Sequence, residues 1–332
     1  MKGCGGSESM GAVSVIMPCY NHARYLSEAV SSILCQTYGH LELLIVDDCS
    51  SDDSWQVACG LAARDCRVKL IRHKTNSGLS KSRNDAMQAS KGALIAFCDS
   101  DDVWEPRKLD VQVRLLQRNP AYDVTYCDTI IIDEAGQATG ELFSRWRPPP
   151  ETASGWLFRE LVQRNFINIQ SVLMRRECMQ HVGLFDEGIE WVQDWYYWIR
   201  LSRHCQFLYS TDACARYRVH SLSTNRVHER EYCVNRFRVF RRILEEYKDL
   251  SPATKSDVLF RMATELCDMK KYRAGRRLLL QAAASSARSV KSIPTCYMAL
   301  RRLVVPRVVC RLIENKCPQN RGVNSTRSDG RN

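Results

Sequence analysis

The sequence predicts an α/β fold with a mostly parallel, twisted sheet and helices on both faces, followed by a basic α-helical C-terminal extension. Before residue 100, apolar segments of strand length alternate four times with helical segments, an order that favours right-handed crossovers and a parallel sheet. The apolar segments lack polar alternation, as expected for strands that are buried on both faces. Basic residues, by contrast, gather toward the C-terminus.

The first strand is predicted at Val13–Met17 and should stop at Pro18, because proline cannot donate a ladder hydrogen bond. Asn21 is expected to cap the next helix, in which apolar residues repeat at helical spacing as far as Leu34. The same patterns predict further strands and helices up to the acidic run at Asp99, at residues 41–46, 55–63, 68–71, 80–90 and 93–98.

From residue 123 onward short strands mix with helices, and after residue 220 the chain is predicted to be almost wholly helical. Residues 194–204 have an amphipathic helical pattern, and residues 258–284 are typical of a helical hairpin. The predicted organisation is a disordered N-terminus, an α/β domain, a basic helical region and a disordered tail, over residues 1–11, 12–225, 226–317 and 318–332.

The net charge of +11 is unevenly distributed. Residues 225–332 hold 24 Lys and Arg against 10 Asp and Glu, whereas the rest of the chain is close to neutral. Such asymmetry indicates an anionic partner. Nucleic acid is not expected, because aromatic residues are not interleaved with the basic ones. Residues 298–316 can form an interfacial helix on an anionic membrane surface, or a helix that packs on the preceding domain.

No apolar run reaches the roughly 18–20 residues that span a bilayer, and the first residues lack the apolar core of a signal peptide. The 16 cysteines include no C-x-x-C pair, so we expect reduced thiols and no zinc site. The expected location is therefore the cytoplasm, with peripheral attachment to the inner face of the cytoplasmic membrane if the basic region binds lipid.

Polar residues follow three of the predicted strands, at residues 18–21, 47–48 and 99–102. They should converge on one rim, because ligands of parallel sheets bind beyond the carboxyl ends of the strands. Asp99, Asp101 and Asp102 can hold Mg²⁺ or Mn²⁺ together with a diphosphate, or they can form a solvated turn that caps a helix. An EF-hand is excluded, because no glycine and distal glutamate follow at the required spacing.

Three other residues each allow a functional and a structural interpretation. Asp48 can accept hydrogen bonds from a nucleobase or ribose, or it can cap the following helix. Arg83, in the first turns of a helix, can bind phosphate or pair with a surface acid. Asp194, flanked by aromatic residues, can be a base with a raised pKa or a helix cap. A lone histidine such as His220 is more often structural.

Five segments, in this order, resemble the family 2 glycosyltransferases, which have the GT-A fold, a Rossmann-like sheet. They are the P-x-Y-N turn in VSVIMPCYNHARYL, the V-D-D-x-S-x-D pattern in LELLIVDDCSSDDS, the stretch NSGLSKSRNDAMQASKGALIAFCDSDDVW, the acidic motif in WVQDWYYWIRL, and YRVHSLSTN. The resemblance covers residues 12–225, and it is closest to transferases of bacterial cell-surface polysaccharides.

The resemblance implies an inverting, metal-dependent transfer of a sugar from a nucleotide-diphosphate sugar to a hydroxyl of a glycan or lipid-linked acceptor. Asp194 would be the base that deprotonates the acceptor. Mn²⁺ or Mg²⁺ would be held by Asp101, with Asp99 nearby and His220 as a further ligand. The implied donor-binding residues are Pro18, Tyr20, Asn21 and Asp48 for the nucleoside, Arg83 for the diphosphate and Asp99 for the ribose.

Two departures from the family pattern refine these expectations. Gln193 stands where the family often has Glu, so contacts with the acceptor can differ, although the adjacent acid is retained. The Q-x-x-R-W motif of processive members is absent, so we expect one or a few sugars per encounter. The alternative is a non-catalytic nucleotide-sugar-binding or scaffold protein with the same fold. A nucleotidyltransferase is disfavoured, because no Gly-rich, basic loop follows the first strand.

Overall fold

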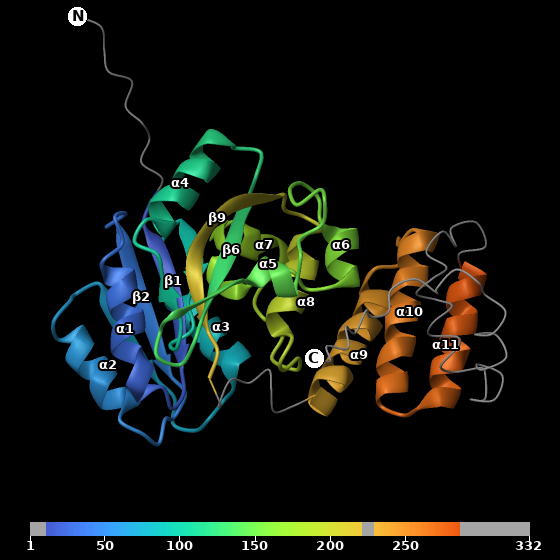
Figure 1. Cartoon of the computed structure of the whole chain (residues 1–332), viewed down its shortest axis with the longest axis horizontal. Helices are drawn as coiled ribbons and strands as arrows, with labels where there is room; N and C mark the ends of the chain where they lie inside the picture. The colour runs from blue at the N-terminus through green and yellow to red at the C-terminus, as the bar shows by residue number, and fades with distance from the viewer. Residues whose placement is uncertain (1–10, 221–228, 286–332) are drawn as a thin grey trace, which may run out of the picture. The chain divides into compact units, whose positions relative to one another are not determined.

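The computed structural model describes residues 11–220 and 229–285 (Figure 1). The chain divides into two compact units between Ile243 and Leu244, and each is described by itself. The predicted tail, the possible interfacial helix at 298–316, and the predicted boundaries at 225 and 317 lie outside the described residues. So does the predicted N-terminal segment, apart from Gly11.

The first half of the sheet in the first unit is parallel, as predicted. Val13 of β1 pairs with Leu41 of β2 on one side and with Leu94 of β4 on the other, and β2 also pairs in parallel with β3. The bounds of these strands are β1 (Val13–Cys19), β2 (Leu41–Asp47), β3 (Val68–Arg72) and β4 (Leu94–Phe97). Their carboxyl ends therefore lie at one edge of the sheet.

The second half adds antiparallel pairs. The strand order is β3-β2-β1-β4-β8-β6-β9-β5, and β7 pairs with β6. Strand β8 is antiparallel to both of its neighbours, whereas β6 and β9 are parallel to each other. The bounds are β5 (Val103–Trp104), β6 (Val124–Ile132), β7 (Ala138–Leu142), β8 (Leu173–Arg175) and β9 (Phe207–Arg218).

Helices cover both faces of this sheet (Figure 1). The helices of the first unit are α1 (Ala23–Leu34), α2 (Ser54–Ala62), α3 (Leu79–Ala89), α4 (Lys108–Arg118), α5 (Phe143–Trp146), α6 (Phe158–Gln163), the 3₁₀ turn Ile169–Ser171, α7 (Cys178–Val182) and α8 (Gln193–Leu201). Helix α9 (Glu229–Glu246) runs to the division between the two units.

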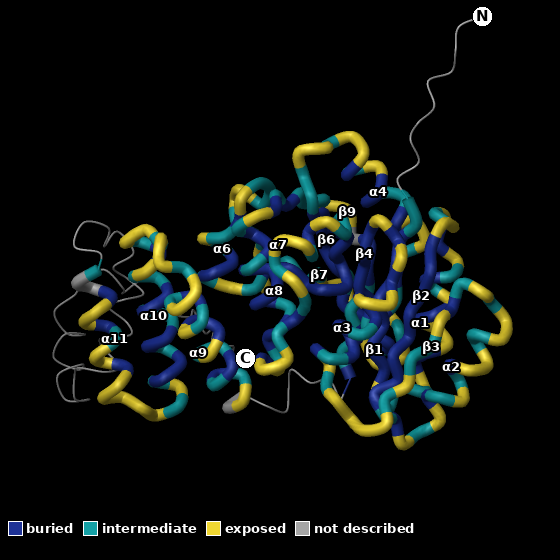
Figure 2. The backbone as a smooth tube through the Cα atoms, turned by 180° about the vertical axis from the view of Figure 1, so that it is seen from behind, coloured by how far each residue is buried: buried dark blue, intermediate teal, exposed yellow. Residues whose placement is uncertain are grey.

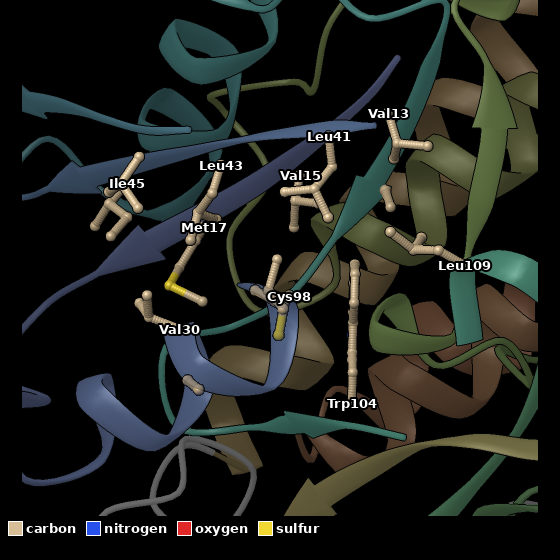
Figure 3. Packing of buried hydrophobic residues seen from close by; sticks show 14 of the residues in the cluster. Val13, Val15, Met17, Val30, Leu41, Leu43, Ile45, Cys98, Trp104 and Leu109 are labelled. Atoms are coloured by element: carbon tan, nitrogen blue, oxygen red, sulfur yellow. The ribbon is translucent and has the colours of Figure 1, made fainter. Parts of the chain in front are cut away.

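Alternate residues of β1 and β2 face the same side of the sheet and form part of one buried hydrophobic cluster. Val13, Val15 and Met17 belong to this cluster together with Leu26 and Val30 of α1, and Met17 lies near Val30 whereas Val13 lies near Leu109 of α4 (Figure 3). Each such side chain stabilises the fold by roughly 1.5–3 kcal/mol on burial. The central strands are the most deeply buried part of the molecule (Figure 2). A rigid sheet therefore holds the loops at its carboxyl edge.

The predicted end of the first strand is wrong, because β1 continues through Pro18 to Cys19. Pro18 pairs with Val46 on the β2 side. On the β4 side, Ile16 is the last paired residue, and its C=O accepts a hydrogen bond from Cys98 at 3.0 Å. Residues i and i+2 of a strand face the same side, so the missing N–H of Pro18 falls beyond the end of the β4 pairing, where proline is tolerated.

The predicted cap of α1 is also wrong. The helix begins after His22, whose side chain makes no capping hydrogen bond, and Asp52 Oδ2 accepts the N–H of Ala23 at 3.0 Å. Asn21 instead adopts a left-handed conformation (φ 56°), which asparagine tolerates better than most residues. Its side chain is thereby turned toward the loop after β2.

The second unit contains a helical hairpin, as predicted. Helix α10 (Pro252–Asp268) is capped by Ser251, whose Oγ accepts the N–H of Thr254 at 3.2 Å, and α11 (Tyr272–Ser285) returns along it. Ser256 donates to the C=O of Ala282 at 2.9 Å between the two helices. None of the described helices is long and apolar enough to cross a membrane.

Candidate active site

Asn21 joins the loops that follow β1 and β2. Its side-chain carbonyl accepts the N–H of Ser51 at 2.8 Å, and its own N–H donates to Ser50 Oγ at 3.0 Å. Pro18 is buried in β1, whereas Tyr20 is 47% exposed. This edge therefore presents an exposed aromatic ring beside a backbone that is fixed on two sides, and aromatic rings of this kind can stack on a base.

Asp48 lies at the end of β2 and is nearly fully buried. Its Oδ1 accepts the N–H of Ser77 at 2.7 Å, and its Oδ2 accepts the N–H of Gly78 at 2.8 Å. His73 Nδ1 lies 2.7 Å from the same Oδ1. A carboxylate offers about four lone-pair positions. Three are used by these contacts, so Asp48 retains capacity for one more donor, on Oδ2.

His73 connects Asp48 to α3. Its Nε2 lies 2.9 Å from Oδ2 of Asp85, and Asp85 forms an ion pair with Lys81 one helical turn away. Lys81 and His73 hold the pKa of Asp85 below its usual range against the opposing effect of burial. The imidazole thus links Oδ1 of Asp48 to Asp85 of α3, whereas Gly78 donates to Oδ2.

Arg83 is almost completely buried in α3. Its Nη2 donates to Asp99 Oδ1 at 2.7 Å, and the guanidinium lies 5.7 Å from the ring centre of Phe185. Its Nε and Nη1 have no hydrogen-bond partner among the described residues. Asp99 is held from its backbone side by Gln170, whose Oε1 accepts the Asp99 N–H at 2.9 Å. A buried cation with spare donors is suited to an anionic ligand.

Asp101 lies between two histidines. His220 Nε2 is 3.0 Å from its Oδ2, and His22 Nδ1 is 3.9 Å from its Oδ1. Burial opposes ionisation of Asp101, but the hydrogen bond from His220 and the nearby His22 hold its pKa below the usual range. The neighbouring Asp102 behaves in the opposite way, since burial and the charges of Asp101 and Asp99 raise its pKa well above that range.

Arg218, at the end of β9, anchors this acidic turn. Its backbone N–H donates to Asp102 Oδ1 and its Nε to the C=O of Asp101, both at 2.7 Å. Its Nη2 forms an ion pair with Glu28 of α1 at 2.7 Å. One buried guanidinium therefore fixes the turn after β4 against α1, and it places His220, two residues further along, beside Asp101.

Asp194 lies in the first turn of α8. Burial raises the pKa of Asp194, and Arg83 and Arg147 oppose that rise. Asn165 Nδ2 is 3.3 Å from Oδ2 of Asp194. The adjacent Gln193 is buried, and its Oε1 has no partner among the described residues. A carboxylate with a raised pKa beside a buried cation is a common arrangement for a general base.

The structure thus brings the predicted residues into three groups linked along the edge of the sheet. Asp48 shares the first with His73. Arg83, Asp99 and Asp194 form the second, and Asp101 and His220 the third. The structure also adds residues that sequence reasoning missed, namely His22, His73, Asn165, Gln170 and Arg218. Two of them had a signal, because Arg218 lies inside the Y-R-x-H segment and His22 directly follows the P-x-Y-N turn.

The donor atoms of the third group, together with that of His22, are chemically suited to a divalent cation. Asp101 offers an ionised carboxylate, and His22 and His220 offer imidazole nitrogens, with one donor atom from each residue within 4.8 Å of the others. Carboxylate and imidazole together are a donor set that first-row divalent metals accept. The residues present therefore fit the metal that the family resemblance implies.

Comparison with known proteins identifies the class. Residues 14–176 match the family described as Glycosyl transferase family 2. The mannosyltransferase PcManGT of Pyrobaculum calidifontis, solved in complex with GDP-Man and Mn²⁺, superposes with a TM-score of 0.60 at 16% identity, over 93% of this chain and 80% of that one. Residues 14–176 thus form a family 2 glycosyltransferase segment, and the fold is similar to that of GT-A glycosyltransferase structures.

Two curated relatives add to this assignment. The putative teichuronic acid biosynthesis glycosyltransferase TuaG of Bacillus subtilis is 29% identical over 64% of this chain and 82% of its own length. The UDP-Glc:alpha-D-GlcNAc-diphosphoundecaprenol beta-1,3-glucosyltransferase WfgD of Escherichia coli is 42% identical over 32% of this chain and 42% of its own length. The first of these similarities spans most of the related protein, whereas the second is limited to less than half of it.

Proposed function

We propose that this chain transfers one sugar at a time, with inversion and with the help of a divalent metal, from a nucleotide-diphosphate sugar to an acceptor hydroxyl. The observation that carries the proposal is the position of Arg83. The same buried guanidinium is hydrogen-bonded to Asp99 and, by its charge, opposes the rise that burial causes in the pKa of Asp194. One cation therefore acts on both the residue proposed for the donor and the residue proposed as the base.

In this proposal the donor lies along the carboxyl edge of the sheet. The backbone around Pro18 and Asn21 and the exposed ring of Tyr20 hold the nucleoside, and Asp48 accepts an N–H of the base through the free position on Oδ2. Asp99 lies beside the ribose, and Arg83 donates to the diphosphate through the nitrogens that have no protein partner among the described residues.

The proposed metal is Mn²⁺ or Mg²⁺, held by Asp101 and His220 with Asp99 nearby. When bound, it neutralises charge that develops on the leaving diphosphate. Arg83 adds a second positive charge from the protein itself. Support comes from the ionised state favoured for Asp101 and from its 3.0 Å contact with His220.

Asp194 is the proposed base. Its carboxylate takes the proton of the acceptor hydroxyl while the hydroxyl oxygen forms a bond to the anomeric carbon. The bond from that carbon to the diphosphate oxygen breaks, and its electron pair leaves with the nucleoside diphosphate. Attack on the face opposite the leaving group inverts the anomeric centre. Holding both reactants in line replaces a bimolecular encounter.

The proposed setting is the assembly of a cell-surface polysaccharide or glycolipid, with a glycan or lipid-linked acceptor. The names of TuaG and WfgD, which refer to teichuronic acid biosynthesis and to a diphosphoundecaprenol-linked acceptor, support this setting. We further propose that the protein acts in the cytoplasm, peripherally attached to the inner face of the membrane.

A group of exposed basic residues supports membrane attachment. Between the end of α10 and the middle of α11 the surface carries five cations and no acid. Tyr272 and Leu280, on the same stretch, are exposed apolar side chains. We call the five cations the α11 basic patch, and they are Lys270, Lys271, Arg273, Arg276 and Arg277. Anionic lipid attracts such residues with roughly 1 kcal/mol each.

The test is transfer by purified protein from a panel of UDP-, GDP- and dTDP-sugars, with Mn²⁺ and a glycolipid extract as acceptor. Asp194→Asn should lower the rate by at least about 100-fold, the usual contribution of a general base, while donor binding is kept. Asp212→Asn, at an exposed position on β9, is the matched control and should retain the rate. Saturable donor binding without transfer by the unmodified protein would instead favour a non-catalytic binding protein.

A further inference from the structure

His22 lies at the metal site proposed above, and it directly follows the P-x-Y-N turn of residues 18–21, for which the family resemblance implies no metal ligand. It comes from the start of α1, whereas Asp101 follows β4 and His220 follows β9. Three distant segments thus bring one donor atom each to within 4.8 Å of the others. His22 Nδ1 is 3.9 Å from Asp101 Oδ1, and its ring centre is 6.0 Å from that of His220.

The position of His22 is fixed by the surrounding structure. Its backbone N–H donates to Ser54 Oγ at 2.9 Å, and its Nδ1 lies 2.8 Å from Ser100 Oγ in the same turn as Asp101. The ring of Tyr25 meets the His22 ring edge-on at 6.2 Å and lies 5.2 Å from His220. Both imidazoles therefore pack near the ring of Tyr25, beside the carboxylate of Asp101.

Asp99, the other acid expected near the metal, has a different partner. Its Oδ1 accepts a hydrogen bond from Arg83 at 2.7 Å, and its backbone is bound to Gln170. An acid paired with a buried arginine is less available as a metal ligand than Asp101, which faces the two histidines.

We infer that His22 is a ligand of the divalent metal, together with Asp101 and His220, and that this donor set selects Mn²⁺ over Mg²⁺. The inference rests on the metal-dependent function proposed above and deepens it. Two imidazoles and one carboxylate make a nitrogen-rich site. Imidazole suits transition metals, whereas Mg²⁺ prefers carboxylate, carbonyl and water oxygens. Octahedral ligands at about 2.1 Å are at most about 4.2 Å apart, so a small inward movement closes the site.

The experiment measures the metal directly in the full chain. Mn²⁺ is titrated in the presence of UDP or GDP, bound metal is followed by electron paramagnetic resonance, and nitrogen ligands are counted by electron spin-echo modulation. The unmodified protein should show two imidazole nitrogens on Mn²⁺, and Mg²⁺ should compete only in large excess. His22→Ala should leave one imidazole nitrogen bound to Mn²⁺ and lower the Mn²⁺ affinity by at least about 10-fold. It should also reduce the preference of the site for Mn²⁺ over Mg²⁺.

Two further variants separate ligation from folding. His22→Asn retains a side chain that can bond to Ser100 but binds Mn²⁺ poorly, so it should behave as His22→Ala does. His40→Ala removes an exposed histidine outside the cluster and should change nothing. One imidazole nitrogen in the unmodified protein, or full Mn²⁺ affinity in both His22 variants, overturns the inference.

The result can be told apart from that of the proposed function. One nitrogen on Mn²⁺ with intact sugar transfer would overturn the role of His22 and leave the function standing. Two nitrogens on Mn²⁺ with no transfer from any donor would support the role of His22 and contradict the function.

Discussion

Opposing influences set the state of Asp194. Burial raises its pKa, while Arg83 and Arg147 favour the charged form that a base requires. Arg83 is also bonded to Asp99 on the donor side, whereas Arg147 is exposed and contacts the C=O of Asn165 at 3.3 Å. Arg147 can therefore be changed while the pairing of Arg83 with Asp99 is retained, which lowers the positive charge near Asp194 without removing the buried guanidinium.

Arg147→Gln should move the acidic limb of the pH profile of kcat/KM to higher pH. With one cation removed, the pKa of Asp194 rises further, so at a given acidic pH a smaller fraction is ionised and able to accept a proton. An exposed pair contributes up to about 1 kcal/mol, so the rate on the acidic limb should fall about two- to fivefold, with little change on the alkaline plateau. The measurement is kcat/KM against pH.

Arg145→Gln is the matched control for this prediction. Arg145 lies on α5, is exposed, and makes a 3.5 Å contact with the C=O of Gly140. The Arg145→Gln variant removes one positive charge two residues before Arg147 and should leave the pH profile of kcat/KM unchanged. An equal displacement by both variants would mean that general surface charge, rather than Arg147, acts on Asp194.

The hairpin of α10 and α11 depends on a close approach at Gly275. A Cβ added there would lie 2.8 Å from Cys267 Sγ and 3.1 Å from the C=O of Ala263. The first distance is shorter than real side chains adopt, and the second involves backbone that cannot move alone. Glycine therefore serves packing at this position, although it costs about 1 kcal/mol of helix propensity relative to alanine.

Gly275→Ala should destabilise the hairpin by up to about 2 kcal/mol, because overpacking costs about 1–3 kcal/mol and the gain in helix propensity offsets about 1 kcal/mol of that. Hydrogen exchange in the full chain measures this loss of stability, because the amides of α10 and α11 should exchange faster in the variant than in the unmodified protein. Cys267→Ala combined with Gly275→Ala removes the closest atom and should restore most of the protection. If the double variant exchanged as fast as Gly275→Ala, the contact with Cys267 would not be the cause.

Charge divides the whole molecule into a near-neutral catalytic part and a basic C-terminal part. The α11 basic patch is the described portion of that surplus. The acids of the catalytic part are bound to named partners at the site, as Asp48, Asp85 and Asp101 are. The net charge of +11 therefore bears on where the protein binds rather than on the reaction.

Replacing all five residues of the α11 basic patch with glutamine should abolish most binding to anionic vesicles. At roughly 1 kcal/mol per residue, the bound fraction should fall at least about 10-fold in flotation with phosphatidylglycerol, while transfer to a water-soluble acceptor is kept. Vesicles of phosphatidylcholine should bind neither protein. The control changes five exposed cations of the first unit, which are Arg64, Lys74, Arg107, Arg118 and Arg164. Equal flotation of the two variants would contradict the role of the patch.

The errors of the sequence-based prediction at residue level share one cause. Asn21 looked like a helix cap and Pro18 like a strand end, because both were judged by their neighbours in the chain. The structure gives Asn21 partners thirty residues away and places Pro18 beyond the end of the β4 pairing. His73 lies in no motif and His22 only follows one, and their carboxylate neighbours come from other strands.

The sequence alone determined the alternation of strands and helices, the parallel first half of the sheet, the family, and the rim at which the acids gather. These follow from local periodicity and from the rule that parallel strands end at one edge. Only the tertiary structure decided which acid faces which partner, pairing Asp99 with Arg83 and Asp101 with His220 and His22. Such pairings depend on distances between segments far apart in the chain, which hydrophobic patterns do not encode.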